Sequence, residues 1–335
     1  MAQYLPTFGD LLAARERLRS LASLTPLIEH PVLNALAGAR VLLKAENLQR
    51  VGAFKFRGAY NKIAQIDKSA FPGGVVACSS GNHAQGVAAA AALRGLKSTI
   101  VMPSDAPRLK IERTRAFGGE VVAYDRVKDD RDAIARDLCA KRGAAYVHPF
   151  DDPDVIAGQG TVGLEMMEQA AAIGAVPDIV LVGASGGGLI SGVSIAVKEK
   201  SPSTQIWSVE PAGFDDLARS LAKGSRERNT ELSGSVCDAL MAVTPGELTF
   251  EMARRNLAGG LSVTDEEAKA AVRFAFRELK LVVEPGGAVS LAAILAKKLP
   301  FEGKTVAAVL SGGNVDASLF AEIILDEQRP RANAA

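Results

Sequence analysis

The chain is poor in cysteine, and the few cysteines that it has are badly placed for cross-linking. Cys78, Cys139 and Cys237 are the only three in 335 residues, and no two of them form a Cys-x-x-Cys pair. Three cysteines cannot build a disulfide framework, which excludes the small disulfide-rich secreted class. A reducing compartment fits this usage best, and we therefore expect a cytoplasmic protein.

The sequence also lacks an excess of charge and a long apolar run. Lys+Arg 39 against Asp+Glu 38 gives a net charge of +1, so no basic field is available to attract nucleic acid. The Ala-rich run from Val87 to Leu93 is far shorter than the roughly 20 residues that cross a membrane. Charged residues between Asp10 and Arg19 interrupt any secretory signal. We expect neither nucleic-acid nor membrane partners.

Apolar residues, in contrast, are abundant. Hydrophobic residues make up 48% of the chain and charged residues 23%, which describes a globular protein with ample core, and 335 residues favour two domains. Short apolar runs alternate with helical patterns, which predicts an α/β fold with parallel sheets covered on both faces. The predicted strands are Val41–Lys44, Val75–Cys78, Ser98–Met102, Glu120–Tyr124, Ala145–Val147, Ile179–Val182, Ile206–Val209 and Thr305–Leu310. The predicted helices include Ala84–Arg94, Arg108–Phe117, Arg131–Lys141 and one that begins at a Thr264/Glu267 capping box and runs to about Lys280.

No shift in composition marks a domain boundary, but the order of elements suggests one. Residues 53–147 form a compact block of predicted strands and helices. We expect this block to be a small domain inserted into a larger one made of residues 1–52 and 148–335. Such an arrangement places a cleft between the two domains, where small-molecule sites are common.

Three consecutive glycines follow the predicted strand Ile179–Val182. The segment Ser185-Gly186-Gly187-Gly188-Leu189 precedes a helical stretch, where backbone N–H groups converge and the helix dipole favours an anion. A tight strand-to-helix turn is the simpler interpretation, and we favour phosphate binding. The segment also fits the Gly-x-Ser-x-Gly pattern of serine hydrolases. All three histidines precede Ser185, however, which breaks the chain order of that triad.

A polar segment, Ser79-Ser80-Gly81-Asn82-His83, leaves the predicted strand Val75–Cys78 and opens a helix. Its hydroxyls, amide and free N–H groups suit a carboxylate or a phenolic oxygen. Helix capping by Ser80 or Asn82 explains this segment equally well when it is taken alone. His83 by itself is more often a packing residue than a catalyst.

Lys55 lies in the segment Gly52–Ala59, between the aromatic residues Phe54 and Phe56. A lysine that forms a Schiff base must be neutral to attack, and a partly desolvated position lowers its pKa. Taken alone, the segment is better explained by a solvated surface lysine. Together with the polar segment and the glycine-rich loop, however, the lysine amine completes the parts of a pyridoxal-phosphate site.

Two further segments carry side chains suited to ligands. Glu210 and Asp216 follow the predicted strand Ile206–Val209, and two carboxylates on one loop can hold a hard cation through oxygen ligands. An ordinary acidic loop explains their spacing somewhat better. The segment from Ser311 to Asn314 follows the last predicted strand and is either a turn or a ligand loop at the strand's carboxyl end.

Together these segments resemble the fold-type-II pyridoxal-phosphate enzymes, and within them the threonine/serine dehydratase and serine racemase family. The similarity runs from about Phe8 to about Phe320, and no C-terminal regulatory domain follows, as in the short catabolic form. The resemblance implies two open, twisted, mostly parallel sheets flanked by helices, in the manner of the tryptophan synthase β chain. It also implies a small domain inserted in a large one, and a homodimer.

The resemblance also implies roles for individual residues. Lys55 matches the Schiff-base lysine, and Ser80 matches the serine on the opposite face of the cofactor ring, so both are catalytic candidates. The matching cofactor-binding residues are Phe54, Lys55, Asn82, Ser185, Gly186, Gly187, Gly188, Leu189 and Ser311. The substrate carboxylate is expected on Ser79, Ser80, Gly81, Asn82 and His83. A divalent-cation site for Mg²⁺, Mn²⁺ or Ca²⁺ matches Glu210, Asp216 and the carbonyl of Phe214.

The implied reaction is β-elimination from a β-hydroxy amino acid, in which Lys55 removes the Cα proton. L-Threonine to 2-oxobutyrate is our first expectation, with L-serine to pyruvate as a secondary activity. Three departures bear on this expectation: Ser185 replaces a glycine, Ala53 replaces a serine, and Cys237-Asp238-Ala239 stands where many members have Ala-Asp-Gly. The segment Gly52–Ala59 is similar to the corresponding segment of family members that act on threo-3-hydroxyaspartate. Conversion of that substrate to oxaloacetate, racemisation of serine and a non-catalytic cofactor-binding protein are the alternatives.

Overall fold

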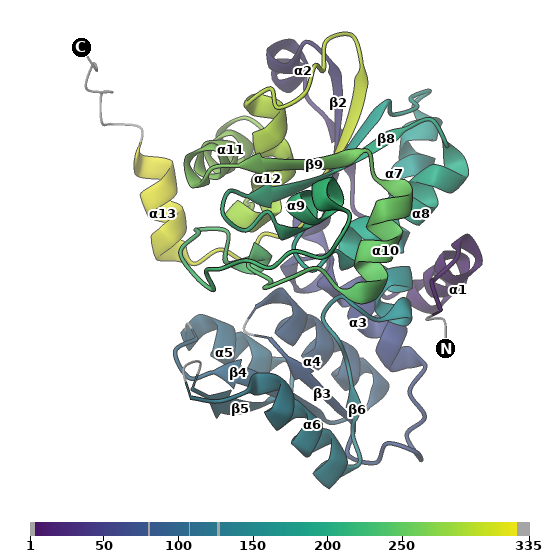
Figure 1. Cartoon of the computed structure of the whole chain (residues 1–335), viewed down its shortest axis with the longest axis vertical. Helices are drawn as coiled ribbons and strands as arrows, with labels where there is room; N and C mark the ends of the chain where they lie inside the picture. The colour runs from purple at the N-terminus through teal and green to yellow at the C-terminus, as the bar shows by residue number, and fades with distance from the viewer. Residues whose placement is uncertain (1–3, 80, 107, 126–127, 327–335) are drawn as a thin grey trace.

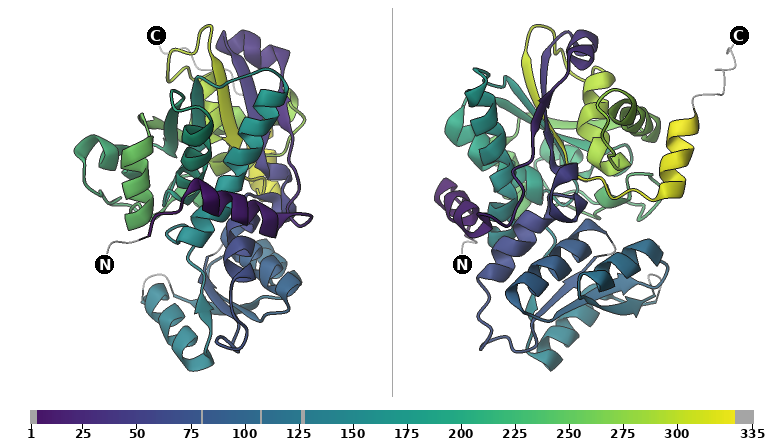
Figure 2. Two further views of the ribbon diagram at one scale, coloured as in Figure 1. Left: turned by 90° about the vertical axis from the view of Figure 1, so that its right-hand side faces the viewer. Right: turned by 180° about the vertical axis from the view of Figure 1, so that it is seen from behind.

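The computed structural model describes residues 4–79, 81–106, 108–125 and 128–326, and it contains two separate β-sheets. The larger sheet has six strands in the order β1-β2-β10-β7-β8-β9, and the smaller has four in the order β5-β4-β3-β6. Figures 1 and 2 show the four-stranded sheet with its helices at one end of the molecule and the six-stranded sheet at the other. The predicted α/β fold with two mostly parallel sheets is confirmed.

The six-stranded sheet is built from the two ends of the chain. Its strands are β1 (Leu27–Glu29), β2 (Arg40–Ala45), β7 (Ile179–Gly183), β8 (Gln205–Pro211), β9 (Gly259–Val263) and β10 (Thr305–Leu310). Only β1 runs antiparallel to its neighbour, and the other pairings between these strands are parallel. The last strand, β10, lies between β2 and β7, so residues from both ends of the chain meet in the middle of the sheet.

The four-stranded sheet comes from one continuous stretch of sequence. Its strands are β3 (Val75–Cys78), β4 (Ser98–Pro103), β5 (Glu120–Tyr124) and β6 (Ala145–Tyr146), and all of their pairings are parallel. This stretch lies within the predicted inserted domain. The exact bounds at residues 52/53 and 147/148 stay a prediction.

Helices cover both faces of each sheet, because alternate strand residues point to opposite sides. In β10, Val306, Ala308 and Leu310 pack in the cluster with α2, α11 and α12, whereas Ala307 and Val309 pack in the cluster with α7 and α8. The helices are α1 (Phe8–Leu18), α2 (Pro31–Ala37), α3 (Lys55–Ala64), α4 (Asn82–Arg94), α5 (Arg108–Ala116), α6 (Arg131–Arg142), α7 (Pro153–Ala172), α8 (Gly188–Lys200), α9 (Asp216–Lys223), α10 (Glu247–Asn256), α11 (Asp265–Arg277), α12 (Pro285–Leu295) and α13 (Ala317–Leu325). Three short 3₁₀ helices are also present: η1 (Glu46–Leu48), η2 (Arg50–Gly52) and η3 (Asp238–Leu240).

Most predicted elements are present within a residue or two of their predicted ends, and the capping box of Thr264 and Glu267 is confirmed at the start of α11. The expected elements did not include the strands β1 and β9, the helix α3, or several other helices such as α2, α9 and α13. β1 has only three residues, and β9 reads Gly-Gly-Leu-Ser-Val with a half-buried pattern, so neither has a strong apolar signal. Among the described residues, no helix is both long and apolar enough to cross a lipid bilayer.

Candidate active site

A cavity of about 220 Å³ lies where the carboxyl ends of β3, β7 and β10 come together. Ligands of open α/β sheets bind at this edge, because the loops that leave the strands converge there. The cavity brings together most of the residues that the sequence singled out. These are Phe54, Lys55, Ser79, Gly81, Asn82, His83, Ser185, Gly186, Gly187, Gly188, Leu189 and Ser311. Ser80, the other catalytic candidate, lies outside the described residues.

Lys55 is the first residue of α3, and its side chain lines the cavity. The Lys55 Nζ donates a 2.7 Å hydrogen bond to the Pro149 carbonyl and lies 5.2 Å from the centre of the Phe54 ring. Burial lowers the pKa of Lys55 from 10.5 to about 8, and no carboxylate in the described part of the chain compensates for the lost hydration. The interpretation of Lys55 as a solvated surface lysine is therefore wrong.

A strained turn immediately precedes Lys55. Val51 has a φ of 61°, which is rare for a β-branched residue, and Gly52 has a φ of 74°. The loop after β10 holds this turn: Asn314 Nδ2 donates to the Val51 carbonyl at 2.7 Å, and the Gly313 N–H donates to the Gly52 carbonyl at 2.9 Å. Ala53 also forms an isolated antiparallel bridge with Gly312. The start of α3 is thus fixed by residues some 260 positions away in the sequence.

The glycine-rich loop joins β7 to α8 and has no room for side chains. A Cβ at Gly186 would lie 2.4 Å from the Phe150 ring, and a Cβ at Gly188 would lie 2.8 Å from Gln159 Oε1. Gly187 has a φ of 91°, which glycine adopts without strain. The loop therefore presents bare backbone and the first N–H groups of α8 to the cavity, which is the donor set that a phosphate requires.

The first residue of this loop, Ser185, has a hydroxyl that is already engaged. The Ala242 N–H donates a 3.0 Å hydrogen bond to Ser185 Oγ. Next to it, Thr249 Oγ1 donates to the Gly186 carbonyl at 2.6 Å and holds the loop against α10. These bonds give Ser185 the role of a loop anchor, which agrees with rejecting the hydrolase interpretation.

The polar segment after β3 leads into α4, whose N-cap is Gly81 and whose first residue is Asn82. The interpretation of Asn82 as the helix cap is therefore wrong, and Ser80 lies outside the described residues. The Asn82 carboxamide instead joins two loops: its Nδ2 donates to Glu284 Oε1 at 2.6 Å, and its Oδ1 accepts a 2.8 Å bond from Asn314 Nδ2. Asn82 is thus held rigidly at the cavity wall.

His83 is buried beneath the same segment and is uncharged. Its Nε2 lies 3.1 Å from the Val147 carbonyl, which fixes Nε2 as the protonated nitrogen because a carbonyl only accepts. Burial, together with the positive charge of Lys55, lowers the pKa of His83 to about 3. The His83 side chain therefore cannot hold a carboxylate by charge, although its backbone N–H lies in the first turn of α4.

Glu284 is a cavity residue that the sequence analysis missed. It is the N-cap of α12, and burial raises the pKa of its carboxyl from 4.5 to about 7. The local signal was weak, since a single glutamate before Pro285-Gly286-Gly287 is an ordinary helix start. Three charged residues at the cavity wall were also missed: Lys110 and Arg131, from the helices beside the four-stranded sheet, and Asp238, which pairs with Lys110.

The predicted cation ligands lie away from this cavity, where β8 leads into α9. Glu210 is fully buried, and its carboxylate accepts bonds from the Leu217 and Ala218 N–H groups at 3.1 and 2.8 Å. Asp216 is also fully buried; its Oδ1 accepts a 2.7 Å bond from Asn229, and its Oδ2 has no hydrogen-bond partner. Burial raises the pKa of both carboxyls. No cluster of three or more His, Cys, Asp or Glu side chains suited to a metal occurs among the described residues.

Comparison with known proteins places these features in one family. The model of the family described as "Pyridoxal-phosphate dependent enzyme" matches residues 18–312. The chain is 42% identical to L-threonine ammonia-lyase of Thermotoga maritima over 318 residues, which cover 95% of this chain and 78% of that protein. It is 40% identical to L-threo-3-hydroxyaspartate ammonia-lyase of a Pseudomonas species, covering 96% and 99%. The structure of maize serine racemase matches with a TM-score of 0.90 at 35% identity, covering 97% and 98%.

Proposed function

The chain belongs to the pyridoxal-phosphate-dependent enzymes, and from that premise we propose that it is an ammonia-lyase acting on β-hydroxy amino acids, with L-threonine as its main substrate. The observation that carries this proposal is the Lys55 amine, which is buried at the wall of a cavity that the glycine-rich loop also lines. A lysine with a pKa of about 8 is neutral often enough at physiological pH to bond to an aldehyde.

The residues around the cavity fit pyridoxal phosphate. Lys55 would hold the cofactor aldehyde, and the backbone N–H groups from Gly186 to Leu189 would hold its phosphate. Phe54, Asn82 and Ser311 would contact the ring, since all three line the same cavity. When bound, the cofactor supplies an electron sink that acidifies the Cα proton of an attached amino acid.

Lys55 then acts as the base that takes the Cα proton of the substrate. Its amine donates a hydrogen bond to the Pro149 carbonyl, a neutral acceptor that leaves the amine lone pair available for this role. The N–H groups at the start of α4 and the hydroxyl of Ser79 would hold the substrate carboxylate. Loss of the β-hydroxyl as water, followed by hydrolysis, converts threonine to 2-oxobutyrate and ammonia, and serine to pyruvate and ammonia.

A second candidate substrate is threo-3-hydroxyaspartate, which would give oxaloacetate. One relative that is 40% identical is named for this substrate, and two cationic side chains, Lys110 and Arg131, line the cavity. Lys110 is already paired closely with Asp238, whereas the contact of Arg131 with Asp132 is a long one of 3.9 Å, so Arg131 is the better placed partner for a second carboxylate. Serine racemisation, the named activity of the maize neighbour, is a third candidate; it needs an acid on the opposite ring face, for which Ser80 is the predicted group.

Three further features belong to the proposal. Glu210, Asp216 and the Phe214 carbonyl would bind a divalent cation, and the unpartnered buried Oδ2 of Asp216 supports this, because a buried carboxylate oxygen needs a partner.

The enzyme would work as a homodimer. It would act in the cytoplasm, since Cys78, Cys139 and Cys237 are all free.

The test begins with the cofactor. We expect the purified protein to absorb in the visible region, and we expect borohydride reduction followed by peptide mapping to place the cofactor mass on Lys55. Release of 2-oxo acid from L-threonine, L-serine and threo-3-hydroxyaspartate then ranks the substrates, with and without Mg²⁺. Cofactor mass on another lysine, or full activity of Lys55→Ala, would remove the proposed site; turnover of hydroxyaspartate alone would keep the site and change the substrate.

A further inference from the structure

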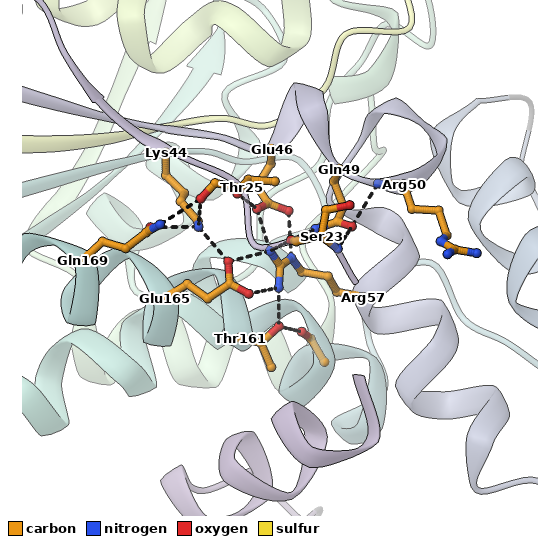
Figure 3. Close-up of polar contacts among 11 residues, drawn as sticks. Ser23, Thr25, Lys44, Glu46, Gln49, Arg50, Arg57, Thr161, Glu165 and Gln169 are labelled. Carbon is orange, nitrogen blue, oxygen red and sulfur yellow. Dashed lines mark hydrogen bonds and ion pairs between the residues drawn. The ribbon is translucent and has the colours of Figure 1, made fainter. Parts of the chain in front are cut away.

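A buried cluster of charged side chains packs around Arg57, in the first turn of α3 (Figure 3). It contains two cations and two anions from four elements: Lys44 at the end of β2, Glu46 in η1, Arg57 in α3 and Glu165 in α7. The Arg57 side chain is 1% exposed, and Lys44 and Glu46 are fully buried. None of the four lines the cavity, so the proposed reaction does not use them directly.

Arg57 is held from two sides at once. Its Nε and Nη2 donate to the two oxygens of Glu46, both at 2.8 Å, and its Nη1 and Nη2 donate to the two oxygens of Glu165 at 2.7 and 2.8 Å. Each carboxylate therefore binds the guanidinium through a two-pronged pair of bonds, which fixes orientation as well as distance. Weaker bonds to Thr161 Oγ1 and the Ser23 carbonyl, both at 3.3 Å, complete the donor set.

The anchoring carboxylates are themselves fixed. Lys44 Nζ donates to Glu165 at 2.6 Å, to the Thr25 carbonyl at 2.7 Å and to Gln169 at 3.0 Å. Thr25 Oγ1 donates to Glu46 at 2.5 Å. The cluster thus ties the first turn of α3 to β2, to η1 and to the long helix α7, which contributes both Glu165 and Gln169 (Figure 3).

Such a cluster is a poor device for stability alone, because two charges lose their hydration for every pair formed. Its better attested use is to select one arrangement among several. Here the selected arrangement is the position of Lys55, which lies two residues before Arg57. Residues two apart on a helix point in nearly opposite directions, so Arg57 points into the core while Lys55 points into the cavity.

From these contacts we propose that Arg57 is a positioning residue, which acts through the helix start to place the Lys55 amine at the cavity wall. The inference rests on the proposed role of Lys55. Two anchors enclose this lysine: the turn at Val51 and Gly52, held by the loop after β10, lies on one side, and the Arg57 cluster lies on the other. Loss of the second anchor leaves the first turn of α3 free to shift or rotate.

Because Arg57 binds each carboxylate through a pair of hydrogen bonds, its positioning role can be tested with substitutions that keep the charge of the cluster. Lysine at this position keeps the positive charge but presents one nitrogen, which cannot bind two carboxylates through paired bonds. Aspartate at position 165 keeps the negative charge but is one methylene shorter. Arg57→Lys and Glu165→Asp therefore change the geometry and leave the charge of the cluster unaltered.

The first measurement is the pKa of Lys55 in the full chain, freed of cofactor. Competitive acetylation across a range of pH, with mass spectrometry of the peptide that carries Lys55, reports this value without any enzymatic turnover. The structure places the pKa at about 8 through burial. We expect the pKa to rise by about one pH unit or more in Arg57→Lys and in Glu165→Asp, because a displaced amine regains water.

The second measurement is turnover of the cofactor-loaded variants. We expect kcat on L-threonine to fall by about 10- to 100-fold, since small displacements of a reacting group are costly, while KM changes little. Lys62→Arg is the matched control. Lys62 lies on the same helix and pairs with Asp152 and Asp154 at 2.8 and 3.0 Å, so it also links α3 to the start of α7, but at the end far from Lys55.

The outcomes separate cleanly. A raised Lys55 pKa in both cluster variants, with the Lys62→Arg value unchanged, supports the proposal. An unchanged pKa in folded Arg57→Lys and Glu165→Asp, or an equal rise in Lys62→Arg, overturns it. If Arg57→Lys does not fold, Glu165→Asp decides by the same criterion. Borohydride mapping distinguishes this failure from failure of the proposed function: cofactor mass on Lys55 with an unmoved pKa refutes only the positioning role.

Discussion

Asn82 Nδ2 donates a 2.6 Å hydrogen bond to Glu284 Oε1 across 202 residues of sequence. The bond joins the start of α4, beside the four-stranded sheet, to the start of α12, which covers the six-stranded sheet. Both residues line the cavity. The protonation state of Glu284 is therefore decided inside the candidate active site, next to a residue expected to contact the cofactor.

This buried carboxyl predicts a pH dependence of stability. Its pKa is raised from 4.5 to about 7, chiefly by burial, so between these values the unfolded chain loses a proton that the folded chain keeps. Stability is therefore lost as the pH rises through this window. Glu284→Gln removes the effect, and we expect its stability relative to wild type to increase by about 3 kcal/mol from pH 4 to pH 8.

Urea unfolding of both proteins across that range is the measurement. Glu278→Gln serves as the control, because Glu278 is exposed and lies six residues away in the chain. Curves for wild type and Glu284→Gln that stay parallel from pH 4 to pH 8 would contradict the raised pKa.

The lowered pKa of Lys55 predicts how fast the stripped enzyme takes up its cofactor. Only the neutral amine attacks an aldehyde, so the rate should rise about tenfold per pH unit and level off above pH 8. His83, whose pKa burial lowers to about 3, is uncharged across this range and adds no second step. Stopped-flow absorbance gives the profile, and a midpoint near 10 would argue against a buried amine.

The glycine-rich loop predicts a specific loss of cofactor affinity. Alanine at position 188 would place a methyl group 2.8 Å from Gln159 Oε1 and 2.9 Å from the Phe150 Cα. Relief of such a clash costs about 1–3 kcal/mol and moves the loop. We expect Gly188→Ala to bind pyridoxal phosphate about 10- to 100-fold more weakly by fluorescence titration. In Gly9→Ala the new methyl group lies 3.6 Å from Thr7 Oγ1, which is ordinary contact, so its affinity should equal that of wild type.

The proposed cation site predicts a metal-dependent melting temperature. Mg²⁺ or Mn²⁺ bound at Glu210 and Asp216 would stabilise the folded chain by about 2.7 kcal/mol at a hundredfold excess over its Kd. Asp216→Asn should abolish the shift, whereas Asp215→Asn should retain it, because Asp215 instead pairs with Arg219. Thermal unfolding with metal and with chelator tests this, and equal shifts in the two variants would place the metal elsewhere.

Local patterns in the sequence were enough to predict the strands of both sheets that carry the cavity loops, because β3, β7 and β10 are nearly continuous apolar runs. The helix α3 was not predicted, since it opens with Lys55-Phe56-Arg57-Gly58 and owes its start to tertiary contacts. Ion pairs between residues far apart in the chain could not be predicted from the sequence either. Nothing near Arg57 indicates that its carboxylate partners stand 11 and 108 residues away.

The position of β10 in the sheet has a consequence for the order in which the molecule can assemble. A ribosome releases the four-stranded sheet as one uninterrupted stretch, so that sheet can close while synthesis continues. The six-stranded sheet cannot close, because the strand between β2 and β7 is the last to be made. The turn before Lys55 can be held in place only later still, once its hydrogen-bond donors Gly313 and Asn314 have been synthesised. We therefore expect a nascent chain to be unable to retain its cofactor until nearly all of it has left the ribosome.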